Sequence, residues 1–170
     1  MIPALDDFGR LPPGRHPAGL DEIHGKFVID APHANARQRL FDALTLWIAQ
    51  ARNRFGSGQV WLDGGFVTHK VTEPRDIDLL FIPTNPDTAE DSLLDGGGFE
   101  LLTLQDLIFA KPEPGGHLRR HQTVGGLIDA YIAHPSDGNA HEVWDRLWSS
   151  VKEDGVILEG VTKGYLVVEV

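Results

Sequence analysis

Residues Val60–Pro83 read VWLDGGFVTHKVTEPRDIDLLFIP and combine two apolar runs with a pair of glycines and a pair of aspartates. The two runs predict β-strands at Gln59–Leu62 and Asp76–Ile82. Because side chains alternate between the faces of a strand, Asp76 and Asp78 should project from the same face, with Cα atoms roughly 6.5 to 7 Å apart. Two carboxylates at that spacing can share a hard cation.

Gly64 and Gly65 end the first apolar run. Glycine has no Cβ, so backbone N–H groups at these positions can approach a polyphosphate closely. An isolated Asp-X-Asp is equally consistent with a solvated strand end. The glycine pair and the carboxylates together, between two apolar runs, are more specific than either alone.

This arrangement resembles the signature of the DNA polymerase β-like nucleotidyltransferase superfamily. That signature is an apolar residue, Gly, then Gly or Ser, a gap, and Asp-apolar-Asp-apolar. The matching residues here are Asp63-Gly64-Gly65 and Asp76-Ile77-Asp78-Leu79. Asp63 departs from the pattern because it is polar where the superfamily has an apolar residue.

A narrower resemblance links the chain to a family of short, largely uncharacterised bacterial proteins. Its members read Gly-Ser-Phe-Val-Thr, a Lys, then Pro and Asp-apolar-Asp, similar to GGFVTHKVTEPRDIDLL at residues 64–80. Their Leu-Pro-Pro-Gly stretch and a Lys-Gly pair are matched by residues 11–14 and by Lys163-Gly164. The expectation for Lys163 is an exposed lysine in a turn, with an approach to phosphate as the alternative.

The superfamily resemblance implies an α+β (α/β) fold, with a nucleotidyltransferase-like mixed β-sheet and helices packed mainly on one face. It also implies a Mg²⁺ cofactor and a third carboxylate from a neighbouring strand. Asp129 is the candidate because it interrupts the apolar segment Gly126–Ala133. Asp76, Asp78 and Asp129 are therefore the expected catalytic and metal-binding residues. The alternative for Asp129 is a solvated position at a strand edge.

The expected nucleotide-binding residues are Gly64, Gly65, Thr68 and Lys70. Gly65 stands where the family commonly has Ser, so a phosphate-binding hydroxyl is missing, and no Arg follows it as in many minimal nucleotidyltransferases. Thr68 and Lys70 lie in the connector beside the expected triphosphate and would compensate. Ordinary surface residues of a connector are the alternative for both.

The function implied by the resemblance is Mg²⁺-dependent transfer of a nucleoside monophosphate from a nucleoside triphosphate, such as ATP, to a protein, RNA or small-molecule acceptor. Short members of the superfamily often belong to bacterial toxin–antitoxin or defence loci. The alternative is a catalytically inactive relative that binds nucleotide or a partner protein. Because no separate substrate domain is evident, the acceptor site would come from the arm, a homo-oligomer or another chain.

Composition limits the partners. The 170 residues carry a net charge of −10, which disfavours non-specific nucleic-acid binding. No apolar run approaches the roughly 18 residues that a membrane span needs, so no membrane association is expected. The absence of cysteine excludes disulfides and thiolate sites and fits a cytoplasmic protein.

The remaining chain is expected to form an arm at residues 1–20 and one nucleotidyltransferase-like domain at residues 21–170. Prolines and glycines in the arm disfavour regular structure. Apolar periodicity predicts helices at 34–55, 88–94 and 140–151, the last capped by Asn139, and strands at 26–29 and 160–170. His117 and His121 are spaced for a shared helix face, but no third ligand is evident for zinc.

Overall fold

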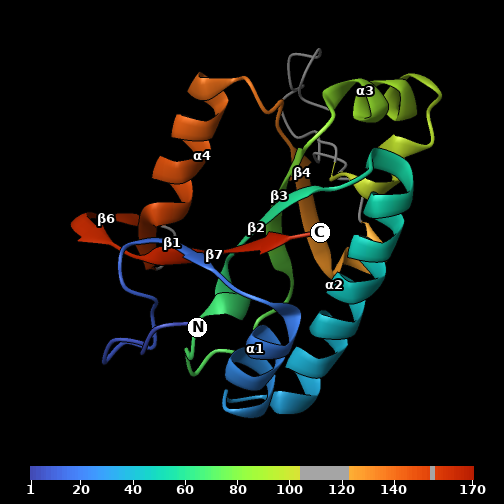
Figure 1. Cartoon of the computed structure of the whole chain (residues 1–170). Coiled ribbons are helices and arrows are strands. Elements are labelled where there is room, and N and C mark those ends of the chain that lie inside the picture. The colour runs from blue at the N-terminus through green and yellow to red at the C-terminus, as the bar shows by residue number, and fades with distance from the viewer. Residues whose placement is uncertain (104–122, 154–155) are drawn as a thin grey trace, which may run out of the picture.

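The structure is a computed structural model that describes residues 1–103, 123–153 and 156–170. A five-stranded mixed sheet with strand order β1-β7-β2-β3-β4 lies at its centre (Figure 1). Its strands are β1 Gly14–Pro17, β2 Gly58–Asp63, β3 Ile77–Pro83, β4 Ile128–Ile132 and β7 Gly164–Glu169. A separate two-stranded sheet pairs β5 Ser150–Glu153 with β6 Val156–Thr162.

Strand directions in the central sheet are mixed. β2 runs antiparallel to both of its neighbours, β3 and β7. The outer pairs are parallel, β3 with β4 and β1 with β7. The predicted combination of helices with a mixed sheet is therefore confirmed.

The described helices lie on both faces of this sheet. They are α1 Leu20–His24, α2 Ala34–Phe55, α3 Pro86–Leu94 and α4 Gly138–Ser149. Residues of the first three pack in the larger apolar core, whereas Trp148 of α4 packs in a second core on the opposite face. Figure 1 shows α4 standing apart from the other helices across the sheet.

Helix α2 has the predicted bounds, because its apolar residues recur on one side along its whole length. Leu44, Trp47, Ala51 and Phe55 are all fully buried. The helix ends at Gly56, whose φ of +78° favours glycine.

One charged residue of α2 is fully buried. Arg37 is 0 % exposed and donates hydrogen bonds to four backbone carbonyls. The acceptors are Pro32 O at 2.7 Å, Phe27 O at 3.1 Å, Phe66 O at 2.7 Å and Thr68 O at 2.6 Å. Arg37 therefore ties the beginning of α2 to the turn that follows β2.

The strand predicted at residues 26–29 is wrong. Gly25–Ile29 forms a short π-helix that continues from α1, with the adjacent residues Phe27 and Val28 both buried. A four-residue apolar run does not distinguish a buried helical turn from a strand, and here the helical turn presents both residues to the core.

The N-terminal arm contains regular structure that its composition did not predict. Gly14–Pro17 forms the edge strand β1, and Gly164 of β7 gives it room, since a Cβ there would collide with Pro12 O. An edge strand tolerates proline because only one of its sides must donate to the sheet. The predicted arm and domain thus share one sheet.

The C-terminal half differs from the prediction in detail. α4 is capped by Asp137, whose carboxylate accepts from Ala140 N at 3.0 Å, rather than by Asn139. The predicted C-terminal strand is divided at Lys163 into β6 and β7. His117 and His121 lie outside the described residues.

Within the described ranges, no helix combines the length and the apolar character that crossing a membrane requires.

Replacing Arg37 by Met should lower the free energy of unfolding by about 3 kcal/mol or more, because several buried carbonyls lose a charged donor. Urea denaturation measures this directly. The control is Arg39→Met, which changes an exposed arginine two residues away and should shift stability by less than about 0.5 kcal/mol. Equal stability of the two variants would show that Arg37 does not hold the turn.

Candidate functional site

Three aspartates lie in line across neighbouring strands of the central sheet. Asp78 of β3 pairs in register with Asp63 of β2 and with Asp129 of β4. The alternation of β3 places Asp78 on the face of Leu80, which packs in the core beside α4. Asp76 lies just before β3. The structure thus brings the predicted carboxylates to one end of this face.

Gly64 lies against the central carboxylate. Its φ of +81° is a conformation that favours glycine, and an added Cβ would collide with Asp78 Oδ2. Gly65 begins a 3-10 turn, Gly65–Val67, and has ordinary space around its Cβ position. The two glycines therefore differ. Gly64 is needed for the close approach to Asp78, whereas Gly65 is exposed and leaves its backbone accessible.

A cavity of about 540 Å³ opens beside this contact. Five sequence-predicted residues line it together: Gly64, Gly65, Thr68, Lys70 and Asp78. Asp76 and Asp129 are not among its lining residues. The cavity also has Tyr131 from β4, Trp144, Leu147 and Trp148 from α4, Ser150 and Lys152 from β5, and the pair Asp63 and Lys163.

Thr68 holds the turn that borders the cavity. Its hydroxyl donates to Gly65 O at 2.8 Å, and its backbone carbonyl accepts from Arg37. The residue is only 2 % exposed. In this arrangement Thr68 fixes the glycine turn. Lys70 is the predicted residue that brings positive charge to the cavity wall.

Lys163 is not an exposed turn lysine, so that expectation is wrong. Its side chain is 11 % exposed, forms an ion pair with Asp63 and donates to Trp148 O at 2.8 Å. Asp63, the polar departure from the superfamily pattern, is the partner that this lysine requires. The sequence signals were an acid ending an apolar strand and a lysine before a glycine 100 residues later. Nothing local connected them.

Electrostatics at this end of the sheet are unfavourable to ionised carboxylates. Burial raises the pKa of Asp78 from 3.8 to about 7, and repulsion from Asp76, Asp63 and Asp129 adds to this effect, while Lys163 opposes it. Burial also raises the pKa of Asp63, against the attraction of Lys163. The site therefore concentrates negative charge that a cation would stabilise.

The carboxylates at this site suit a cation that takes part of its coordination shell from water and from its ligand. Among the residues that the structure describes, no group of three or more His, Cys, Asp or Glu side chains encloses a metal position. Mg²⁺ usually takes only one or two carboxylates and completes its shell with water and phosphate oxygens. Asp76 and Asp78 suit that requirement beside the open backbone of Gly65.

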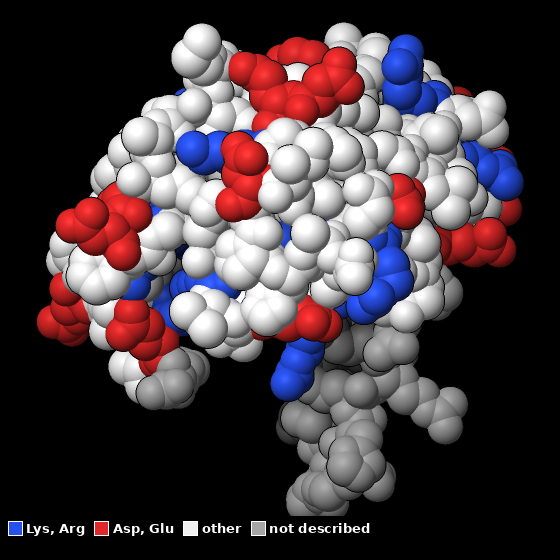
Figure 2. All heavy atoms as spheres, turned by 90° about the horizontal axis from the view of Figure 1, so that it is seen from below, with Lys and Arg blue, Asp and Glu red and all other residues white. Residues whose placement is uncertain are grey.

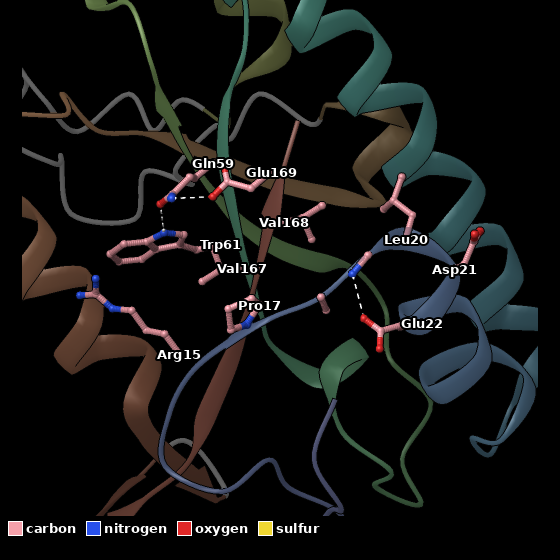
Figure 3. Close-up of a pocket in the computed structure, with 12 residues that line it drawn as sticks. Arg15, Pro17, Leu20, Asp21, Glu22, Gln59, Trp61, Val167, Val168 and Glu169 are labelled. Carbon is pink, nitrogen blue, oxygen red and sulfur yellow. Dashed lines mark hydrogen bonds between the residues drawn. The ribbon is translucent and has the colours of Figure 1, made fainter. Parts of the chain in front are cut away.

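A larger cavity of about 940 Å³ lies elsewhere on the sheet, between the arm, α1, β2 and β7 (Figure 3). Its polar groups bond to one another: Gln59 donates to Glu169 at 2.7 Å and accepts from Trp61 at 3.4 Å. The Arg15 guanidinium stacks 4.2 Å from the Trp61 ring and pairs with Asp145. This cavity holds none of the clustered carboxylates, so the smaller cavity is the better candidate site.

Surface charge is mixed on the face shown in Figure 2. Lysines and arginines of the described residues lie between carboxylates there and do not form one continuous basic surface. This face therefore offers few adjacent positive charges for the phosphates of a nucleic-acid backbone.

Comparison with known proteins places the chain in a family. Residues 3–169 match the family described as "Family of unknown function (DUF6932)". The chain belongs to this family. No curated protein matches it, and neither does any solved structure. The DUF6932 match includes the arm as well as the glycine turn and the carboxylates, so both are parts of one family sequence.

Gly64→Ala should lower the free energy of unfolding by about 1 to 3 kcal/mol, because the new Cβ meets Asp78 in a backbone conformation that favours glycine. Gly65→Ala is the matched control. Its Cβ would have Pro74 as nearest neighbour at 3.6 Å, so stability should change by less than about 0.5 kcal/mol. Urea unfolding of both variants tests this, and similar losses would contradict the close approach.

Stability should also depend on pH through Asp78. A carboxyl whose pKa rises from 3.8 to about 7 on folding stabilises the fold fully only below its unfolded value, and this contribution is lost as pH rises towards 7. Without divalent cations, Asp78→Asn should therefore exceed wild type in unfolding free energy at pH 8 by about 1 kcal/mol or more.

The difference between Asp78→Asn and wild type should shrink at pH 4, and urea unfolding across this range measures it. Asp91→Asn, an exposed carboxylate on α3, serves as control and should follow wild type. A constant difference between Asp78→Asn and wild type at all pH values would contradict the assigned repulsion and burial.

Proposed function

We propose that this protein is a Mg²⁺-dependent nucleotidyltransferase that moves a nucleoside monophosphate from a nucleoside triphosphate to an acceptor hydroxyl. The observation that carries the proposal is the contact between Gly64 and Asp78 at a cavity with cationic walls. Lys70, Lys152 and Lys163 all border that cavity. The site thus offers open backbone, carboxylates and ammonium groups together, which suits a metal-bound triphosphate.

Asp76 and Asp78 would hold the cation, and its chemistry there would be to neutralise charge that develops on the transferred phosphoryl group. The turn at Gly64 and Gly65 presents backbone that phosphate can approach. Lys70 and Lys152 border the same cavity and would stabilise the departing pyrophosphate.

Asp129 would accept the proton of the acceptor hydroxyl. Its carboxylate accepts from Thr103 Oγ1 at 3.4 Å, which orients it from the neighbouring segment. The reaction forms a bond between the acceptor oxygen and the α-phosphorus, and it breaks the bond from that phosphorus to the bridging oxygen of pyrophosphate. The proton passes to Asp129, so the charges balance.

A second function has one specific observation in its favour. Asp76 and Asp129 are not among the residues that line the cavity, whereas Asp78 is. A site with only one of the three predicted metal-binding carboxylates at the cavity would bind a metal-bound nucleotide without turning it over. The protein would then act as a nucleotide-responsive binding module.

Isothermal titration calorimetry with each of the four nucleoside triphosphates tests the shared requirement. Wild type should bind at least one of them with Mg²⁺ and lose that binding with a chelator. The Asp76→Asn, Asp78→Asn double variant should bind more than about tenfold more weakly, since even outer-shell partners of a metal contribute that much.

Asp91→Asn should keep wild-type affinity in the same titrations. Absence of Mg²⁺-dependent binding in wild type, or equal binding by the double variant, would refute both functions. Transfer of label from an α-³²P nucleotide to an acceptor, with release of pyrophosphate, separates the enzyme from the binding module.

A further inference from the structure

One wall of the candidate cavity is aromatic and apolar. Tyr131 projects from β4, and Trp144, Leu147 and Trp148 project from α4, all lining the cavity that also contains Gly64. The Tyr131 and Trp144 rings lie 4.8 Å apart at an interplanar angle of 41°. These four side chains are named the aromatic wall.

The side chains of the aromatic wall are only partly buried by core packing. Trp148 is 4 % exposed and belongs to the core between α4 and the sheet. Tyr131 and Trp144 are half-buried, and Leu147 is 39 % exposed. Apolar surface therefore remains beside a cavity whose other side carries carboxylates and lysines. A phosphate alone would make no favourable contact with the aromatic wall. A ligand with a flat ring and a charged tail matches both the aromatic wall and the charged side of the cavity.

The wall is held at a fixed place relative to the carboxylates. Trp144 packs on Trp148 at 5.4 Å and 65°, and Trp148 packs on Tyr165 at 5.8 Å and 79°. The backbone carbonyl of Trp148 accepts from Lys163, which pairs with Asp63. The ion pair that borders the carboxylates thus also positions the helix that carries Trp144.

We propose that the aromatic wall binds the base of the nucleoside triphosphate by stacking on Trp144, with the triphosphate directed towards Gly64, Gly65 and Lys70. This inference rests on the proposed function and adds to it the part of the substrate that the aromatic wall recognises. Stacking uses the π-face that every nucleobase has, so the wall supplies affinity for a base without reading its edge.

The experiment compares two probes in the full-length chain by calorimetry with Mg²⁺: inorganic tripolyphosphate, and whichever of the four nucleoside triphosphates binds wild type most tightly. Wild type should bind the nucleoside triphosphate more tightly than tripolyphosphate. Trp144→Leu should weaken nucleoside triphosphate binding by about tenfold or more and leave tripolyphosphate binding within about twofold of wild type.

Trp144→Phe keeps a flat ring and should restore most of the lost affinity. Urea unfolding of both variants identifies any change in stability, and Trp144→Phe keeps the test usable if Trp144→Leu does not fold, since a Phe ring should bind the nucleoside triphosphate more tightly than tripolyphosphate.

Three results would overturn the inference. Equal affinity of wild type for the two probes would show that the base makes no contact with the wall. An equal loss for both probes in Trp144→Leu would assign Trp144 a structural role. If tripolyphosphate still binds wild type in either of these cases, the proposed function stands. The third result is that wild type binds neither probe, and it would refute the proposed function as well.

Discussion

The site depends on the register of β3 between its two neighbours. Pairing of Asp78 with Asp63 on one side and Asp129 on the other puts three carboxylates in one line. A slip of one residue would turn Asp78 into the larger core, against α2, and Leu79 out of that core, because strand side chains alternate with a period of two. The fully buried residues Leu79 and Phe81, which pack against α2, therefore hold the carboxylates in place from the opposite face of the sheet.

Arg37 supplies the second constraint, on the backbone beside the carboxylates. Burying a guanidinium completely costs free energy unless its donors are satisfied, and here they bind the carbonyls of Phe27, Phe66 and Thr68. Burial lowers the pKa of Arg37, because it disfavours the charged form. The residue links the core helix to the turn of Gly65–Val67, so core packing and site geometry change together.

Local sequence patterns were sufficient for the elements that carry their own periodicity. α2 has the predicted bounds, and β2 and β3 differ from their predicted bounds by one residue at each end. The approach of Gly64 to Asp78 follows from the same stretch, since Gly64 comes directly after β2 and Asp78 lies in the neighbouring strand β3.

Features that depend on distant partners were not predictable in this way. Arg37 looks like a surface residue until the carbonyls of the turn surround it, and Lys163 looks like a turn lysine until Asp63 is placed beside it. The edge strand β1 exists because β7 offers it a partner. The aromatic wall has the same origin: helical spacing on α4 indicated an apolar face, but only the packing of α4 over β4 shows that Trp144 reaches the cavity.

The proposed site is tested most directly by the position of a metal ion and a triphosphate in crystals grown with Mn²⁺ and a non-hydrolysable nucleoside triphosphate. We expect an anomalous manganese peak at the Asp78 carboxylate, with phosphate density beside Gly64 and Gly65. Phosphate density in the larger cavity of Figure 3, with no manganese at Asp78, would contradict it.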